Sequence, residues 1–285
     1  MKLVIVTGLS GSGKSIALNT LEDAGYYCID NLPLFLLPSF TEALVARRDP
    51  RYRLTAVGID ARNQSDLTNL SPILEPMKGR EIEYEVIYLE ARDDTLIKRY
   101  SETRRRHPLS DGEHPLAEAI RLERRVLGPF LDRADLRIDT THTNVHQLRH
   151  IIRTRVAEHR STSISILFES FGFKHGVPHD ADFVYDLRCL PNPHWNPILR
   201  PLTGRDQEVI RFLENNAQVR EMRETLSRFL EQWIPCFEAD GRSYLTVAVG
   251  CTGGQHRSVY MAEWLSRHFA GQGRQVLTRH RELSA

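Results

Sequence analysis

The sequence has no marked excess of charge, no cysteine motif and no long apolar run. The formal net charge of the 285 residues is +1, and basic and acidic residues nearly balance in both halves, so composition alone does not indicate nucleic-acid binding. Four cysteines stand far apart with no Cys-x-x-Cys pair, which favours reduced thiols over a disulfide framework. No apolar stretch approaches the length of a membrane span or of a secretion signal. We therefore expect a cytoplasmic protein.

Short apolar runs alternate with helical patterns along the first half of the chain. This alternation predicts βαβ units, and hence an α/β domain with a parallel sheet and flanking helices. A glycine-rich loop at residues 8–15 marks this domain as P-loop kinase-like. A polar stretch at residues 161–163 marks the expected domain boundary, with a nucleotide-binding domain over 1–160 and a second domain over 161–285. The predicted strands are 3–7, 26–30, 54–60, 85–90 and 135–139, and the predicted helices include 14–24, 116–131 and 144–160.

The second half predicts another α/β domain with a phosphate-binding strand–loop–helix. Its expected strands are 165–170, 182–187 and 244–249, and its expected helices lie within 207–238 and 259–270. An apolar stripe at helical spacing falls within the first of these helical regions, and we interpret it as core packing. Its members are Met222, Leu226, Phe229, Leu230 and Trp233.

A glycine-rich loop follows the first predicted strand. Residues 8–15 read GLSGSGKS and match the pattern GxxxxGK[ST] between a strand and a helix. Glycines let several N–H groups point at one phosphate, and the helix that begins at Lys14 adds the positive end of its dipole. We expect Lys14 to contact the β- and γ-phosphates of ATP or GTP and the Ser15 hydroxyl to ligate Mg²⁺. The predicted nucleotide-binding residues are Gly8, Leu9, Ser10, Gly11, Ser12, Gly13, Lys14 and Ser15, and the last two are the catalytic candidates.

A carboxylate associated with Mg²⁺ should lie at the end of a neighbouring strand. Asp30 and Asp60 both end predicted strands, and we favour Asp60. An aspartate in this place also commonly caps the next helix, which is the alternative role. The predicted metal ligands are therefore Ser15 and Asp60.

Cationic side chains are concentrated in residues 97–107, which read IKRYSETRRRH. Kinases close an arginine-rich lid over the phosphates, where it excludes water and offsets developing charge. The same residues would also suit a solvated helix end or a contact with RNA phosphates. The lid candidates are Arg99, Arg104, Arg105 and Arg106.

Three histidines recur at four-residue spacing, at His142, His146 and His150. On a helix they would share a face and could hold a metal. No carboxylate or cysteine pattern accompanies them, so we favour an exposed helix face.

A second candidate phosphate loop has the spacing Cys-x5-Arg-Ser, from Cys251 to Ser258. In cysteine-dependent phosphatases such a loop cradles a phosphate with N–H groups and a bidentate arginine, and the helix end depresses the cysteine pKa. Catalysis also needs a general acid. Residue 250 is Gly where the phosphatase pattern usually has His. We favour anion binding without chemistry over a phosphatase or a plain turn. The general-acid candidates, near in sequence only, are Asp180, Asp182 and Asp186.

Polar residues in two other stretches could converge with this loop on one anion. The stretches are 170–176, which carries a lysine and a histidine, and 188–195, which carries an arginine and a histidine. Singly these are ordinary loop residues, but together with a second phosphate loop they favour a binding pocket. The predicted anion-binding residues are Lys174, His175, Arg188, His194, Cys251, Thr252, Gly253, Gly254 and Arg257.

Six stretches, spread over nearly the whole chain, together resemble the RapZ family of bacterial nucleotide-binding proteins, also called RNase adapter proteins. They are residues 8–15, 27–33 (YCIDNLP), 60–63 (DARN), 169–176 (ESFGFKHG), 190–193 (LPNP) and 250–259 (GCTGGQHRSV). The resemblance implies ATPase and GTPase activity with Mg²⁺ in the N-terminal domain. It also implies that Asp60, Ala61, Arg62 and Asn63 contribute to GTP binding.

The resemblance further implies a C-terminal domain that senses glucosamine-6-phosphate, binds small regulatory RNA and presents it to a ribonuclease. We also expect a homo-oligomer. Family members with the RNA role extend this chain by a Lys/Arg-rich tail, whereas this chain ends RHRELSA, with fewer phosphate contacts available. RNA contact would rest on the patches at 104–106 and 274–281. The alternative functions are a small-molecule kinase and a phosphatase that uses Cys251.

Overall fold

The computed structural model describes residues 1–63, 70–77, 82–103, 106–110, 115–158 and 164–283. The chain forms two compact units, Met1–Glu158 and His159–Ala285, each with its own sheet and core. Both sheets are parallel and carry helices, so the predicted α/β fold class is confirmed. The expected boundary at 161–163 lies outside the described residues. No helix in the described ranges is long and apolar enough to cross a membrane.

The first unit contains a five-stranded sheet in the order β2-β3-β1-β4-β5, with every pair parallel. Because parallel strands end at the same edge, the residues that follow them gather there. The register places Gly8 opposite Leu89 and Glu90 opposite Asp139 at this edge. The strands are β1 (Lys2–Gly8), β2 (Tyr27–Ile29), β3 (Leu54–Gly58), β4 (Glu83–Glu90) and β5 (Leu136–Asp139).

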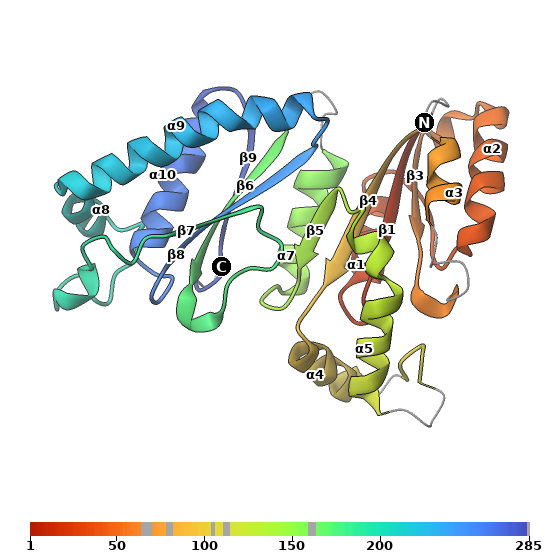
Figure 1. Cartoon of the computed structure of the whole chain (residues 1–285), viewed down its shortest axis with the longest axis horizontal. Coiled ribbons are helices and arrows are strands. Elements are labelled where there is room, and N and C mark those ends of the chain that lie inside the picture. Colours follow the sequence, from red (N-terminus) through yellow and green to blue (C-terminus); the bar gives the residue numbers. More distant parts are fainter. Residues whose placement is uncertain (64–69, 78–81, 104–105, 111–114, 159–163, 284–285) are drawn as a thin grey trace. The chain divides into compact units, whose positions relative to one another are not determined.

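Helices cover the sheet of the first unit, with α1 and α7 on one side and α2 and α3 on the other (Figure 1). The predicted helix over 116–131 is divided at Leu127, because Gly128 and Pro129 begin a separate short helix. The closing helix starts at a capping box between Asn144 and Gln147. The helices are α1 (Lys14–Asp23), α2 (Leu37–Arg47), α3 (Ser71–Leu74), α4 (Asp93–Thr103), α5 (Leu116–Val126), α6 (Gly128–Leu131) and α7 (Val145–Ile152), which continues as a π-helix, η5 (Arg153–Ala157).

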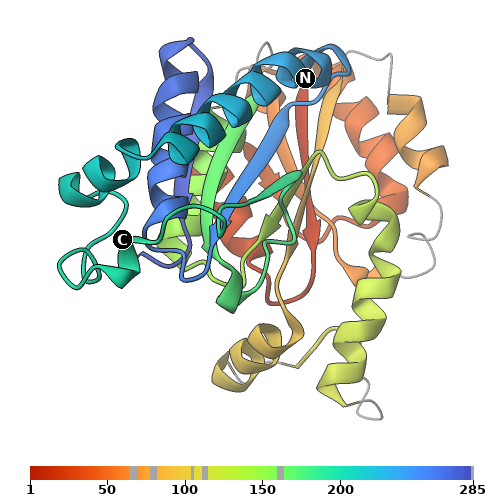
Figure 2. The same cartoon turned by 60° about the vertical axis from the view of Figure 1, so that its left-hand side comes forward.

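The second unit contains a four-stranded parallel sheet in the order β7-β8-β6-β9. Helix α10 packs against β6, β8 and β9, and it can be followed beside the sheet in Figure 2. The strands are β6 (Ser165–Gly172), β7 (Phe183–Asp186), β8 (Tyr244–Cys251) and β9 (Gln275–His280), and the helices are α8 (Gln207–Glu214), α9 (Ala217–Ala239) and α10 (Arg257–Gly271).

Residues 274–281, one of the two patches on which RNA contact was expected to rest, contain a strand, β9, that was not predicted. Arg279 pairs with the buried Glu169 at 3.2 Å, and Arg274 pairs with Glu238 at 2.6 Å. The strand went unpredicted because only two of its six residues are apolar and its pairing partner, β6, lies more than a hundred residues earlier in the chain. Two of the arginines expected to meet RNA are therefore used inside the domain.

The apolar stripe of α9 is buried only in part, so its interpretation as core is wrong for two members. Leu226 and Leu230 are buried, whereas Phe229 and Trp233 are 38% and 43% exposed. The stripe is wider than the face that meets the sheet. Phe229 instead packs at the sheet margin, where its ring lies 5.5 Å from that of Phe183 on the edge strand β7.

Candidate functional site

The loop between β1 and α1 has a backbone that only glycine allows at two places. Gly8 has φ +134°, and a Cβ there would lie 1.9 Å from the Leu89 carbonyl oxygen. Gly13 has φ +110°, and a Cβ there would lie 2.6 Å from Leu148 Cδ2. Helix α1 begins directly after Gly13 with no side chain capping its first turn. The N–H groups at this helix start are thus available to an anion.

Lys14 folds back onto this loop. Its ammonium group donates a 2.6 Å hydrogen bond to the Gly8 carbonyl oxygen. Burial lowers the pKa of Lys14 below its ordinary value, and the carboxylates of Glu123 and Asp60 only partly offset that effect. A dianionic phosphate beside Lys14 would compensate the buried charge better than one carbonyl oxygen does.

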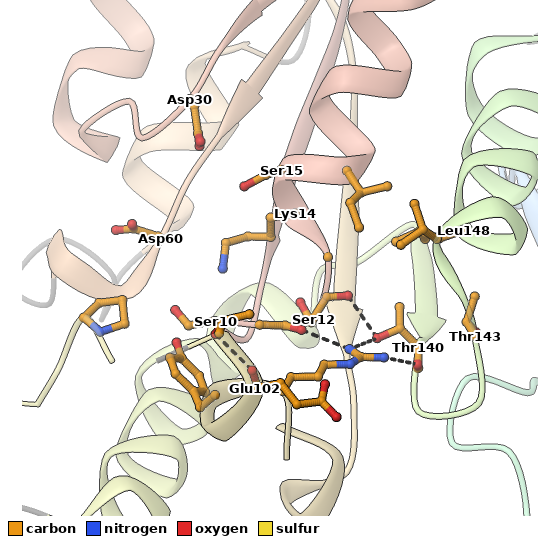
Figure 3. A pocket seen from close by; sticks show the side chains of 18 of the residues that line it. Ser10, Ser12, Lys14, Ser15, Asp30, Asp60, Glu102, Thr140, Thr143 and Leu148 are labelled. Carbon is orange, nitrogen blue, oxygen red and sulfur yellow. Dashed lines mark hydrogen bonds between the residues drawn. The ribbon is translucent and has the colours of Figure 1, made fainter. Parts of the chain in front are cut away.

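A cavity of about 650 Å³ opens over the loop. Figure 3 shows Lys14 and Ser15 pointing to the side on which Asp30 and Asp60 lie, with Thr140 and Leu148 on the other side. The cavity is also lined by Asn31, Arg62, Arg106, Thr143 and Asn144. Residues after four different strands of the sheet therefore meet at one hollow, as expected where parallel strands end.

Asp60 follows β3 and is held by its neighbours. It accepts the N–H of Arg62 at 3.0 Å and pairs with Arg62 Nε at 3.1 Å. The Asn31 amide, turned so that its nitrogen faces Asp60, donates at 3.0 and 3.1 Å. Asp30 is exposed at the cavity rim. Ala61 is buried beneath this turn, and Asn63 ends it.

The oxygen donors at this edge fit Mg²⁺, which takes one or two carboxylates, a hydroxyl and phosphate oxygens. Ser15, Asp30 and Asp60 all line the cavity. Among the described residues no three His, Cys, Asp or Glu side chains are grouped to hold a metal unaided. His142, His146 and His150 are exposed. A magnesium ion here would therefore depend on the phosphates of a ligand.

Arg99 on α4 ties the loop to the end of β5. Its guanidinium donates to the Gly11 carbonyl at 2.9 Å and to the Thr140 carbonyl at 2.6 Å. The Thr140 hydroxyl in turn donates to the Ser12 carbonyl at 2.9 Å. Arg99 lines the cavity and contacts the backbone of the loop directly. Arg106 lines the cavity, and Arg104 and Arg105 lie outside the described residues.

Glu123 on α5 is a loop contact that the sequence did not reveal. Its fully buried carboxylate accepts the N–H of Ser10 at 2.8 Å and the Ser10 hydroxyl at 2.6 Å. The residue stands in a helix rich in charged side chains, LAEAIRLERRV, where no spacing distinguishes it from solvated neighbours. Only its contact with Ser10 in the folded unit shows that Glu123 belongs to the site.

The second candidate loop joins β8 to α10. The Cys251 sulfur lies 3.2 Å from the Ser258 hydroxyl, and Cys251 is buried. Burial by itself raises the pKa of the Cys251 thiol. The Ser258 hydroxyl, the N–H groups of Ser258 and Gly254 and the charge of Arg257 outweigh burial, so that this pKa falls below its ordinary value. The loop therefore stabilises a negative charge at its base.

Arg257 is directed at the main chain of a neighbouring segment. Its guanidinium donates to the carbonyl oxygens of Arg188 at 3.0 Å and Leu190 at 2.9 Å, and reaches the Thr252 hydroxyl at 3.4 Å. Arg188 itself pairs with Asp186 and lies 4.0 Å from the centre of the Phe173 ring. Both arginines expected to clamp an anion therefore also have partners within the protein.

Two other predicted segments do approach the loop. The Lys174 N–H donates to the Thr252 carbonyl at 3.3 Å, and the His194 and His256 rings are 6.4 Å apart. A Cβ at Gly172 would lie 2.8 Å from the Gly253 carbonyl carbon, which shows how closely the backbones pack. Lys174, His175 and His194 are exposed. The general-acid candidates Asp182 and Asp186 are held by Arg242 and Arg188.

Both halves of the chain match models of one protein family. The model of the RapZ-like N-terminal domain covers residues 1–160, and that of the RapZ C-terminal domain covers residues 164–284. The chain belongs to the RapZ family. Among its RapZ-like relatives, a nucleotide-binding protein of Thioalkalivibrio sulfidiphilus is 57% identical and one of Nitrosococcus oceani is 56% identical, each over the full length of both chains.

Solved structures with some likeness to this RapZ family member include small-molecule kinases. A shikimate kinase of Bacteroides thetaiotaomicron is 14% identical, with a TM-score of 0.35 over 53% of this chain and 94% of that chain. A gluconokinase of Sinorhizobium meliloti is 19% identical, with a TM-score of 0.24 over 47% of this chain and 94% of that chain.

The ionisation of Cys251 can be measured directly, because a thiolate absorbs in the ultraviolet where a thiol does not. The difference between wild-type and Cys251→Ser absorbance should titrate below the range of an ordinary cysteine. Ser258→Ala should raise this midpoint by up to about one pH unit, because it removes a hydrogen bond to the charged form. Cys28, whose pKa burial raises to about 11, provides the internal comparison. A Cys251 midpoint in or above the ordinary range would contradict the geometry.

Proposed function

We propose that this chain binds Mg²⁺ with ATP or GTP in the loop of residues 8–15 and hydrolyses the nucleotide slowly in a regulatory role. The observation that carries the proposal is the glycine-constrained loop at the uncapped start of α1, facing a cavity of about 650 Å³. The RapZ-like relatives support it, because they are named nucleotide-binding proteins.

Different residues of this site bind the phosphates and the magnesium ion. The N–H groups at the start of α1 hold the β-phosphate, and Lys14 moves from the Gly8 carbonyl to the β- and γ-phosphates. Ser15 and Asp60 would hold Mg²⁺, which neutralises charge on the phosphates when bound. Asp60 and Arg62 lie at the cavity wall, consistent with the GTP contacts that the family resemblance implies.

Replacing Lys14 by Ala should reduce affinity for Mg²⁺–ATP and Mg²⁺–GTP by about a hundredfold or more, since a charge-assisted contact to phosphate is lost. Calorimetric titration would measure this, with Lys98→Ala, an exposed lysine on α4, as the matched control. Equal affinity of wild type and Lys14→Ala would refute the proposed site. Hydrolysis that accelerates strongly with a metabolite hydroxyl acceptor would instead identify a kinase.

We further propose that the loop of residues 251–258 binds a phosphosugar, with glucosamine-6-phosphate as the candidate that the family resemblance implies. The loop stabilises negative charge at Cys251. The exposed Lys174 contacts it through its N–H, and the ring of the exposed His194 lies 6.4 Å from that of His256. Hydrolysis would need a general acid, but Asp182 and Asp186 are ion-paired with Arg242 and Arg188. Arg257 also has a partner within the protein, so we favour binding over hydrolysis.

Titration of the full chain with glucosamine-6-phosphate should show saturable binding. Lys174→Ala should weaken it about threefold to tenfold, because an exposed ammonium contributes only part of the phosphate contact. Arg228→Ala on the exposed side of α9 is the control. Equal affinity of wild type and Lys174→Ala for the phosphosugar would count against this assignment. So would release of inorganic phosphate by the wild type that Cys251→Ser abolishes.

RNA binding by the second unit is the third part of the proposal. Trp195 is 78% exposed, and on the same loop Arg200 donates to the His194 carbonyl at 3.1 Å. An exposed aromatic ring on a loop that also carries an arginine suits stacking on an unpaired base.

Affinity for a structured small RNA with unpaired bases should fall steeply with salt, because phosphate contacts release counterions. Trp195→Ala should weaken binding about fivefold to a hundredfold through lost stacking, whereas Trp233→Ala on α9 serves as control. No binding at low salt, or an affinity that is flat with salt, would exclude this role.

A further inference from the structure

A buried hydrogen-bond network fastens the first loop to a distant part of its unit. Glu123 is 0% exposed and accepts three hydrogen bonds, from the Ser10 N–H at 2.8 Å, the Ser10 hydroxyl at 2.6 Å and His107 Nε2 at 3.1 Å. The His107 side chain is fully buried as well. Removing a carboxylate from water is costly unless donors surround it, so this arrangement requires every one of these contacts.

The direction of the hydrogen bonds fixes the state of both partners. The Leu109 N–H donates to His107 Nδ1 at 3.1 Å, so Nδ1 carries a lone pair and the proton is on Nε2. Nε2 then donates to Glu123, which is the ionised partner. Burial alone raises the pKa of Glu123, but His107, Lys14 and Ser10 lower it below its ordinary value. The pair is therefore a carboxylate and a neutral imidazole.

His107 connects this carboxylate to the wall of the cavity. The residues on either side of it, Arg106 and Pro108, both line the cavity, and so does Tyr100, whose ring centre lies 5.4 Å from that of His107. One network thus contacts Ser10 in the loop and the segment 106–109, two residues of which form part of the cavity wall. Arg99 holds the adjacent residue, Gly11, through its carbonyl oxygen.

We propose that Glu123 is a positioning residue, which sets the backbone of the phosphate loop through Ser10 and couples that backbone to segment 106–109. The Ser10 hydroxyl is committed to Glu123, so it serves as an anchor and not as a donor to phosphate. With Ser10 and Gly11 both fixed, the following N–H groups keep the orientation that one phosphate requires. Arg106 is then held at a set distance from that phosphate. The inference rests on the proposed nucleotide site.

Three variants separate the parts of this contact. Glu123→Ala removes every bond and should weaken Mg²⁺–ATP binding about tenfold or more. Glu123→Gln can keep all three, because its oxygen accepts from the Ser10 N–H and from His107 while its nitrogen donates to the Ser10 hydroxyl. It should stay within about threefold of wild type. Ser10→Ala keeps the backbone bond and should fall between them. Glu118→Ala, exposed on the same helix, is the control.

Hydrogen exchange of the same proteins supplies a readout that a general loss of stability would not reproduce. Glu123→Ala should speed exchange at the N–H groups of residues 9–13 and of residues 106, 107 and 109 together, while the strands of the sheet stay protected. Uniform acceleration over the whole unit would overturn the proposal, as would wild-type affinity in Glu123→Ala. If that variant does not fold, Ser10→Ala decides: unchanged exchange and affinity would overturn it. Absence of nucleotide binding in the wild type would sink the proposed function instead.

Discussion

The first unit depends on a short stretch of backbone in which two residues, Gly8 beside β4 and Gly13 beside α7, leave no room for a side chain. A methyl group at Gly8 would overlap the Leu89 carbonyl, and one at Gly13 would overlap Leu148. The parallel pairing of β1 with β4 brings Leu89 to this place, so the sheet itself imposes the constraint. This close packing leaves the N–H groups at the start of α1 without a side chain that caps them, so they can bind an anion.

The two candidate phosphate loops share a strand–loop–helix backbone but differ in the side chains that they place at the anion position. Each follows a central parallel strand and opens a helix, which gathers N–H groups around one point. The first places an ammonium group beside that point, and the second places a thiol whose pKa the loop lowers. In both, the cation of the loop bonds to main-chain carbonyl oxygens, Lys14 to Gly8 and Arg257 to Arg188 and Leu190. A phosphate at either loop must compete with those contacts.

The sequence predicted the elements that depend on residues close together in the chain. The strand, glycine loop and helix over residues 2–23 were evident, because apolar alternation, glycine spacing and the lysine all lie within one short segment. The fold class followed from repeating that unit. Strand β9 was missed because its pairing with β6 is remote in sequence, and the ion pairs of Arg274 and Arg279 were not foreseen because Glu238 and Glu169 approach them only in the folded domain. Glu123 was missed for the same reason. The choice between Asp30 and Asp60 as the magnesium ligand stays a prediction.

The most direct test of the account is a crystal structure of the full chain with Mg²⁺ and a non-hydrolysable ATP analogue. The β-phosphate should lie within the N–H groups that precede α1, and Lys14 Nζ should have left the Gly8 carbonyl for a phosphate oxygen. The Ser10 contact with Glu123 should be unchanged. A nucleotide bound elsewhere, with Lys14 still on Gly8, would contradict the central claim that this backbone is a phosphate site.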